Sequence, residues 1–312
     1  MLHPPGSPHE LPEDELPRTR TLARKPHNGV ALRDRLVEGA WVRPLALFLI
    51  AFGVYGVTAF DRALKHSPDN HFVYLATTYN SMIAAALGSS KAQAQRAELE
   101  PFELARTPHH RNDWASYYEL TLSEPRAEVA RGVWMERPGR GIFRLLDGRE
   151  MLLEPGSYER AKTKRRYFVS FPPGPAFLMM PLVAIFGWST NDVLFTLFFA
   201  ALNVALVFVL LEQLAIGGRT GRSRRDNYWL TAMFALGTNH YWCAVLGQVW
   251  FTALIVGTTF TLLYMIWGAD ARRPLLAGCA LAMAFATRLA SSQLRPVIGD
   301  VPGIGLGLPA GP

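Results

Sequence analysis

The sequence predicts an all-α fold, a polytopic bundle of transmembrane helices with a large polar loop after the first span. Of the 312 residues, 50% are hydrophobic and 18% are charged, and the charges are concentrated in a few blocks. The segments almost free of charge are 44–60, 168–187, 192–214 and 228–267. Because about 20 apolar residues in a helix cross the hydrocarbon core of a bilayer, these segments predict membrane spans.

The charge pattern divides the chain into five parts. The first, 1–43, is rich in proline and mixed charges without an apolar run, so we expect a disordered tail and not a cleavable signal peptide. The first span, 44–60, is followed by the polar loop, 61–166, and then by further spans within 167–288. The last part, 289–312, is rich in glycine and proline, which a helix in lipid does not accept.

The end of the chain has two interpretations. The final apolar piece, Leu275–Thr287, is too short to span a membrane comfortably, and the composition changes completely after it. One interpretation is a natural flexible terminus. The favoured one is a chain that is truncated or frame-shifted part-way through its sixth helix.

Two patterns predict secondary structure in the polar loop. In His71–Gly88, aromatic and aliphatic residues recur at helical spacing, which predicts an amphipathic helix along the membrane surface or a helix packed on the loop's own core. In Gly132–Arg149, glycines separate short apolar pieces, as is typical of hairpin strands or turns. After the loop, three prolines in Tyr167–Trp188 mark a helix entry, where proline loses no hydrogen bond.

The net positive charge of the chain does not predict a nucleic-acid partner. The net charge is +7, but basic residues are interleaved with almost as many acids, so a membrane-flanking role explains them more simply. Four arginines in Gly217–Asn227 favour a cytoplasmic position for that short loop. Counting spans from a cytoplasmic N-terminus places the same loop outside, so the charges leave the topology open.

Four motifs carry a resemblance to a known family. They are Ser67–Ala76 (SPDNHFVYLA), Asp113–Ala115 (DWA), Tyr167–Gly187 (YFVSFPPGPAFLMMPLVAIFG) and Gly247–Ala253 (GQVWFTA). In their order and spacing, the chain resembles the membrane-embedded glycosyltransferases of the C-type fold, which use polyprenyl-phosphate sugars. The motifs are most similar to a bacterial branch related to the protein mannosyltransferases and aminoarabinose transferases.

The resemblance implies transfer of a sugar from a polyprenyl-phosphate donor to a hydroxyl acceptor by a multi-pass protein of the cell inner membrane. A lipid-phosphate sugar already has a good leaving group. The enzyme therefore mainly needs a carboxylate to take the acceptor's proton and cationic groups to hold the phosphate. The expected partners are the lipid bilayer and the lipid-linked sugar, and a divalent metal ion is an open candidate for a cofactor.

Two aspartates are the predicted catalytic residues. Asp69 is the predicted base, since an acidic residue precedes an aromatic-rich helix in the related transferases; it could also cap that helix, and the two roles can coexist. The other candidate, Asp61, is more simply an interfacial charge that ends the first span. Asp113 is predicted to support catalysis by positioning the acceptor or a metal. His109, His110 and Asp113 together are not expected to form a metal site, because two adjacent histidines do not easily face one ion.

His71, Arg165 and Arg166 are predicted to bind the substrate, His71 at the sugar or phosphate and the arginines at the phosphate. The alternatives are an interfacial histidine without a special role and a lipid-headgroup anchor. Thr77 departs from the family pattern, which often has an acid there. A non-enzymatic membrane protein, either a transporter-like fragment or an inactive remnant, stays a rival, although no inverted repeat is visible.

Overall fold

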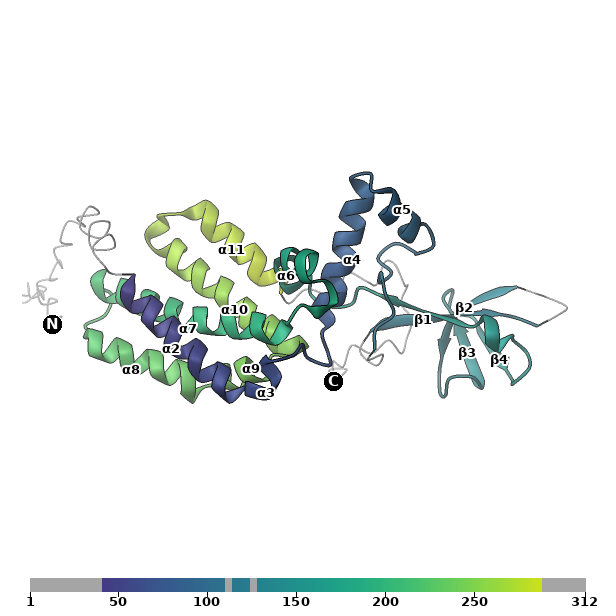
Figure 1. Ribbon diagram of the computed structural model, residues 1–312, viewed down its shortest axis with the longest axis horizontal. Helices are drawn as coiled ribbons and strands as arrows, with labels where there is room; N and C mark the ends of the chain where they lie inside the picture. The colour runs from purple at the N-terminus through teal and green to yellow at the C-terminus, as the bar shows by residue number, and fades with distance from the viewer. Residues whose placement is uncertain (1–40, 110–113, 124–127, 288–312) are drawn as a thin grey trace, which may run out of the picture. The chain divides into compact units, whose positions relative to one another are not determined.

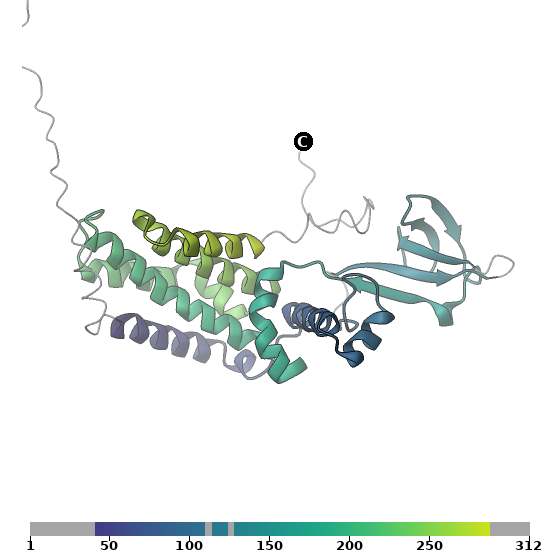
Figure 2. The same ribbon diagram turned by 90° about the horizontal axis from the view of Figure 1, so that it is seen from above.

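The computed structural model describes residues 41–109, 114–123 and 128–287 (Figures 1 and 2). The chain divides into two compact units, and all the elements below belong to the second, Val42–Pro312. The predicted tail, 1–43, therefore lies almost entirely outside the described residues, as does the part after 287.

The prediction of an all-α polytopic bundle is wrong. The described residues contain a five-stranded antiparallel sheet within the predicted polar loop. By length and composition, two helices of the described residues could cross a membrane, α7 (Asp192–Ile216) and α10 (Val249–Gly268, extended by a short turn to Ala271). The prediction failed because a helix buried in a protein core has the same apolar composition as one in lipid.

The other predicted spans form shorter helices. The stretch 44–60 lies in α2 (Val42–Thr58), and Tyr167–Trp188 contains α6 (Pro173–Phe186), which begins at the prolines as predicted. The apolar stretch after 228 is broken into α8 (Arg224–Gly237) and α9 (Asn239–Leu246). Thr238 causes the break: its backbone is extended, and its hydroxyl accepts a hydrogen bond from the first turn of α9.

The strands of the sheet lie in the order β4–β3–β2–β1–β5. They are β1 (Ala115–Thr121), β2 (Val129–Trp134), β3 (Gly141–Leu145), β4 (Glu150–Leu153) and β5 (Lys164–Phe168). The hairpin predicted in 132–149 is confirmed, since β2 and β3 pair there. The central strand β1 pairs with both β2 and β5, so that Tyr118 lies opposite Gly132 on one side and Arg165 on the other.

Helix α7 is the centre of the helical part (Figure 1), packing against α2 on one side and α10 on the other. Helix α11 (Pro274–Ala286) packs along α10. The side chains of Tyr55, Leu197 and Ile255 are fully buried where α2, α7 and α10 meet. These three helices therefore share one apolar core.

A buried amide joins α7 to α10 within that core. Asn203 is fully buried, and its Nδ2 donates to the carbonyl oxygen of Ile255 at 2.9 Å. Its Oδ1 accepts from the Thr259 hydroxyl at 2.6 Å. Because a buried polar group without a partner is costly, these bonds fix the register of the two helices.

Helix α4 (His71–Ala86) packs against α6. Its first two turns are buried, from His71 to Ala76. The predicted helix is therefore confirmed, but the core on which it packs includes α6, α7 and α10 and is not the polar loop's own core. The neighbouring helices are α3 (Phe60–Ala63) before it and α5 (Ser90–Ala97) after it.

Replacing Gly132 by alanine is expected to disrupt the β2–β3 hairpin. A Cβ there would overlap the backbone carbonyl of Arg144 on the paired strand, and neither backbone can move without breaking the ladder. Hydrogen exchange of the β2 and β3 amides should become faster in Gly132→Ala. The control is Gly53→Ala in α2, where the added Cβ meets nothing within 4 Å and alanine is favoured by about 0.5–1 kcal/mol. Unchanged exchange in Gly132→Ala would contradict the register described.

Candidate functional site

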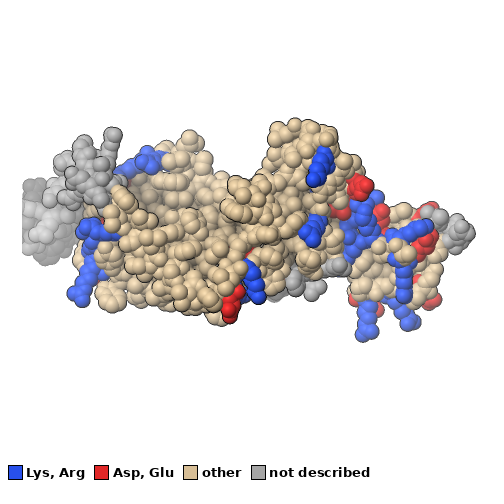
Figure 3. Space-filling view, in the orientation of Figure 1, with Lys and Arg blue, Asp and Glu red and all other residues tan. Residues whose placement is uncertain are grey.

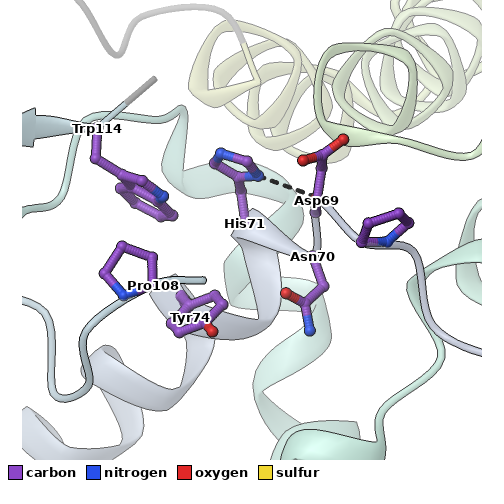
Figure 4. A pocket seen from close by; sticks show the side chains of 7 residues that line it. Asp69, Asn70, His71, Tyr74, Pro108 and Trp114 are labelled. Carbon is purple, nitrogen blue, oxygen red and sulfur yellow. Dashed lines mark hydrogen bonds between the residues drawn. The ribbon is translucent and has the colours of Figure 1, made fainter. Parts of the chain in front are cut away.

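A shallow hollow lies at the N-terminus of α4, where the chain leaves α3 and enters the polar region (Figure 4). Its lining residues are Pro68, Asp69, Asn70, His71, Tyr74, Pro108 and Trp114. Figure 4 shows the Asp69 carboxylate and the His71 ring on one side of this helix start, and the Asn70 amide on the other. A carboxylate and an imidazole therefore share one opening.

An aromatic cluster extends from the hollow into the protein, and its members His71 and Trp114 line the hollow. The rings of His71 and Trp114 are stacked, with centroids 4.7 Å apart, and Phe171 meets both rings edge-on at 4.5 and 4.9 Å. Trp250 continues the cluster, 5.3 Å from Phe171. Each of these four residues comes from a different one of the four motifs in the sequence. The structure thus brings all four motifs to one place.

His71 is held in this cluster by its own backbone region as well. Its Nδ1 lies 3.0 Å from the backbone carbonyl oxygen of Asp69. Because a carbonyl oxygen only accepts, this contact requires the proton on Nδ1. The side chain is almost completely buried, its Nε2 included, so the structure does not present the ring to a ligand.

Asp69 is half-buried at the rim. Helix α4 begins at His71 and has Asn70, not Asp69, at its cap position. The Asn70 side chain makes no capping hydrogen bond.

The segment that carries Asp69 is fixed to the start of α7. The buried Asp192 carboxylate accepts hydrogen bonds from the backbone amide of Ser67 at 2.7 Å and from the Ser67 hydroxyl. The neighbouring Asn191 amide donates to the carbonyl oxygen of Ala63 at 2.8 Å. Two consecutive side chains thus hold the path from α3 to the hollow.

Sequence reasoning missed Asp192, which it counted at the edge of an apolar stretch. A signal was present, because Asn-Asp directly before an apolar run is typical of a helix N-terminus. Asn191 does cap α7, accepting from the amide of Leu194 at 3.0 Å. The partner of Asp192, Ser67, is 125 positions away and carries no signal of the pairing.

Arg166 lies in the sheet and does not line the hollow. Its guanidinium donates to the carboxylates of Glu103 at 2.6 Å and Glu119 at 2.7 Å, and its residue is 9% exposed. Burial by itself lowers the pKa of Arg166, but the hydrogen bonds to these carboxylates outweigh it and hold the pKa above its ordinary value. The charge predicted to bind phosphate is thus already balanced within the protein.

Arg165 also lies on β5, away from the lining of the hollow. Its Nη2 and Nε donate to the Ser116 hydroxyl at 2.9 and 3.1 Å. Its guanidinium lies over the rings of Tyr118 and Tyr167, about 5 Å from each centroid. The phosphate role of Arg165 and Arg166 stays a prediction that the site geometry does not support.

A different arginine lies next to the hollow and was missed from the sequence. The guanidinium carbon of Arg106 is 4.8 Å from the ring centroid of Trp188, which in turn packs 4.9 Å from the ring of Tyr74. Arg106 is exposed, and no carboxylate of the described residues forms an ion pair with it. Nothing in its sequence surroundings indicates this position, because Trp188 is distant in the chain.

The remaining predicted site residues are placed as follows. Asp113 and His110 lie outside the described residues, although the adjacent Trp114 lines the hollow. Thr77 lies further along α4 and donates to the carbonyl oxygen of Val73 at 2.8 Å. Within the described ranges, no three His, Cys, Asp or Glu side chains come together as metal ligands would. The described residues therefore do not fit a divalent metal ion.

Comparisons with protein families, with curated proteins and with solved structures found no match to this chain. The resemblance based on the four motifs stays a prediction, and the function has to be argued from the geometry of the site.

Removing the charge of Arg166 is expected to destabilise the sheet. Arg166→Gln would leave Glu103 and Glu119 close together in a largely buried place, which typically costs on the order of 3 kcal/mol or more. The measurement is the midpoint of chemical unfolding. The control is Arg149→Gln, which breaks an exposed pair with Asp147 and should change the midpoint little. Equal effects of both substitutions would contradict the structural role.

Weakening the contact between Asp192 and Ser67 is expected to make the segment that leads into the hollow more mobile. The Ser67 amide and hydroxyl donate to different oxygens of Asp192. In Asp192→Asn one of these oxygens becomes an NH2 group, which cannot accept, and the other becomes a neutral acceptor, a loss of about 1 kcal/mol or more. The Ser67 amide should then exchange several-fold faster, as measured by hydrogen exchange. Asp226→Asn, at the start of α8, is the matched control and should leave this amide unchanged. Protection of Ser67 that does not depend on Asp192 would exclude the proposed anchor.

Proposed function

We propose that the protein is a membrane-bound glycosyltransferase that moves a sugar from a polyprenyl-phosphate donor to a hydroxyl acceptor. The observation that carries the proposal is the convergence of the four motifs. His71, Trp114, Phe171 and Trp250 each lie in a different one of these motifs, and they form one aromatic cluster that begins beside Asp69.

The composition of the hollow supports a sugar ligand. Small-molecule sites are mostly apolar and aromatic, with a few polar groups that fix the orientation. Here the rings of His71, Tyr74 and Trp114 are combined with the polar side chains of Asp69 and Asn70. The hollow is shallow, so the sugar would lie across its mouth and not inside an enclosed cavity.

The surface of the helices supports a bilayer as the partner. Figure 3 shows few charged residues over the helices and many over the strands. Large apolar side chains are exposed on several helices; examples are Ile50 (63%), Val57 (77%), Ile185 (74%), Met233 (64%) and Leu275 (78%). Extended exposed apolar surface marks a contact with membrane or protein. We propose that this apolar surface contacts the bilayer of the cell inner membrane, and that α7 and α10, the two described helices of sufficient length and apolar composition, cross it.

The chemical step of the proposal is a displacement at the anomeric carbon. The Asp69 carboxylate takes the proton of the acceptor hydroxyl as its oxygen forms the bond to that carbon. The bond from the anomeric carbon to the phosphate oxygen breaks, and polyprenyl phosphate leaves with the electron pair. The anchor between Ser67 and Asp192 holds Asp69 at the end of α7, where a lipid-linked donor can reach it.

Arg106 is our proposed contact for the phosphate, in place of Arg165 and Arg166. A guanidinium binds phosphate through paired hydrogen bonds, provided that its donors are not already used. Arg106 stands over Trp188 next to Tyr74, a lining residue of the hollow. Arg165 and Arg166 instead donate to groups within the sheet.

Replacement of Asp69 by asparagine is expected to abolish sugar transfer, because loss of a general base costs about 100-fold or more. The assay uses membranes that contain the 312-residue chain and polyprenyl-phosphate hexoses or pentoses with a labelled sugar. The control is Asp61→Asn, a nearby exposed carboxylate in α3. Full activity of Asp69→Asn would contradict the assignment of the base. A wild-type chain that transfers no sugar from any of these donors would contradict the function itself.

A further inference from the structure

One end of the helical part is rich in arginine. Helices α7 and α10 end there, and α8 and α11 begin there. The ion pair between Arg219 and Asp270 joins the turn after α7 to the turn after α10, so the two turns lie side by side. We call this region the arginine end; it contains Arg219, Arg222, Arg224, Arg225, Arg272 and Arg273.

The arginine end has more arginines than carboxylates in the described residues. The carboxylates placed there in the described residues are Glu212, Asp226 and Asp270. Glu212 pairs with Arg224, and Asp270 pairs with two other arginines. Asp226 instead closes the capping box of α8 with Ser223. The described residues therefore provide three carboxylates for six arginines.

Within the described part of the chain, Arg225 and Arg273 are the two arginines of this region that are exposed and form no ion pair, although the charge of Arg225 does act on the nearby Asp226 carboxylate. Arg222 is half-buried beside them, and its Nε has no hydrogen-bond partner in the described part of the chain. The exposed guanidinium groups of Arg225 and Arg273 are available to an anionic partner, whereas the Nε of Arg222 is buried.

Apolar and aromatic side chains next to these arginines indicate what that partner is. Trp229, one turn after Arg225, is 64% exposed, and Leu275, two positions after Arg273, is 78% exposed. A soluble anion would gain nothing from them. Exposed tryptophan and leucine beside unpaired arginine are typical of a membrane interface, where the apolar groups enter the acyl region and the cations meet headgroups.

We infer that the arginine end binds the headgroups of anionic phospholipids. It is a surface separate from the hollow, because the Asp192 anchor and the arginine end lie at opposite ends of α7. The 25 residues of α7 span about 37 Å at 1.5 Å per residue, enough to cross a bilayer. Short basic loops stay on the cytoplasmic side. Headgroup binding at the arginine end therefore places Asp69 on the opposite side of the membrane.

The test measures lipid binding by the purified 312-residue chain in detergent, by native mass spectrometry with phosphatidylglycerol or phosphatidylcholine. The wild-type chain should retain phosphatidylglycerol preferentially. Each basic residue near an anionic surface contributes about fivefold, so Arg225→Gln with Arg273→Gln should weaken that retention by about 25-fold. A matched control with the same charge change is Arg140→Gln with Arg149→Gln on the sheet, and it should retain the lipid like the wild-type chain.

Three results would overturn the inference. One is equal retention of the two lipids by the wild-type chain, and another is an equal loss in both double variants. The third is displacement of phosphatidylglycerol by inorganic phosphate at the same concentration, which would make the region a site for the free anion. None of these results depends on sugar transfer, so the inference and the proposed function can fail separately.

Discussion

The buried contact between Ser67 and Asp192 is the interaction on which the proposed site depends. A carboxylate removed from water is costly unless hydrogen bonds replace its hydration. The backbone amide and hydroxyl of Ser67 supply these bonds. In return, the contact fixes the two residues that follow Ser67 and so sets the position of Asp69. Because Asp192 begins the long apolar helix α7, the contact fixes the proposed catalytic carboxylate of Asp69 relative to the helix that packs on both α2 and α10.

A second constraint is the ring packing around His71. Trp114 directly precedes the sheet, Phe171 lies between the sheet and α6, and Trp250 is in the first turn of α10. Their contacts therefore join a strand, a helix entry and an apolar helix to α4. This packing explains how a polar segment and the apolar helices can build one site. It also explains why the four motifs are spread so widely along the chain.

Local patterns predicted much of the secondary structure. The helix after Asn70, the helix entry at the prolines before α6, the apolar helices α7 and α10, and the hairpin of β2 and β3 all follow from short-range spacing. The sheet as a whole did not follow. Strands β1 and β5 are distant in the sequence, and their pairing is a long-range contact that periodicity does not reveal. The apolar composition then led to an all-α prediction, since core helices and membrane spans look alike.

The candidate site was predicted only in part, for the same reason. Asp69 and His71 precede and begin a helix, and their closeness follows from their spacing. Arg166 looked like a free cation because its partners, Glu103 and Glu119, lie 63 and 47 positions away. Arg106 was not noticed because its neighbour Trp188 is equally remote in sequence. Charge can be read from a sequence, but the balance of that charge depends on the fold.

The most direct test of the central claim is to locate the donor on the protein. A polyprenyl-phosphate sugar with a photoreactive group on the sugar ring would be irradiated with the chain in lipid nanodiscs, and the labelled peptides identified by mass spectrometry. We expect labels on the segment from Ser67 to Tyr74 and around Trp114. An excess of the donor without the photoreactive group should prevent this labelling. The proposed site would be contradicted if the labels that the donor prevents were confined to strands β2 to β4 or to the arginine end.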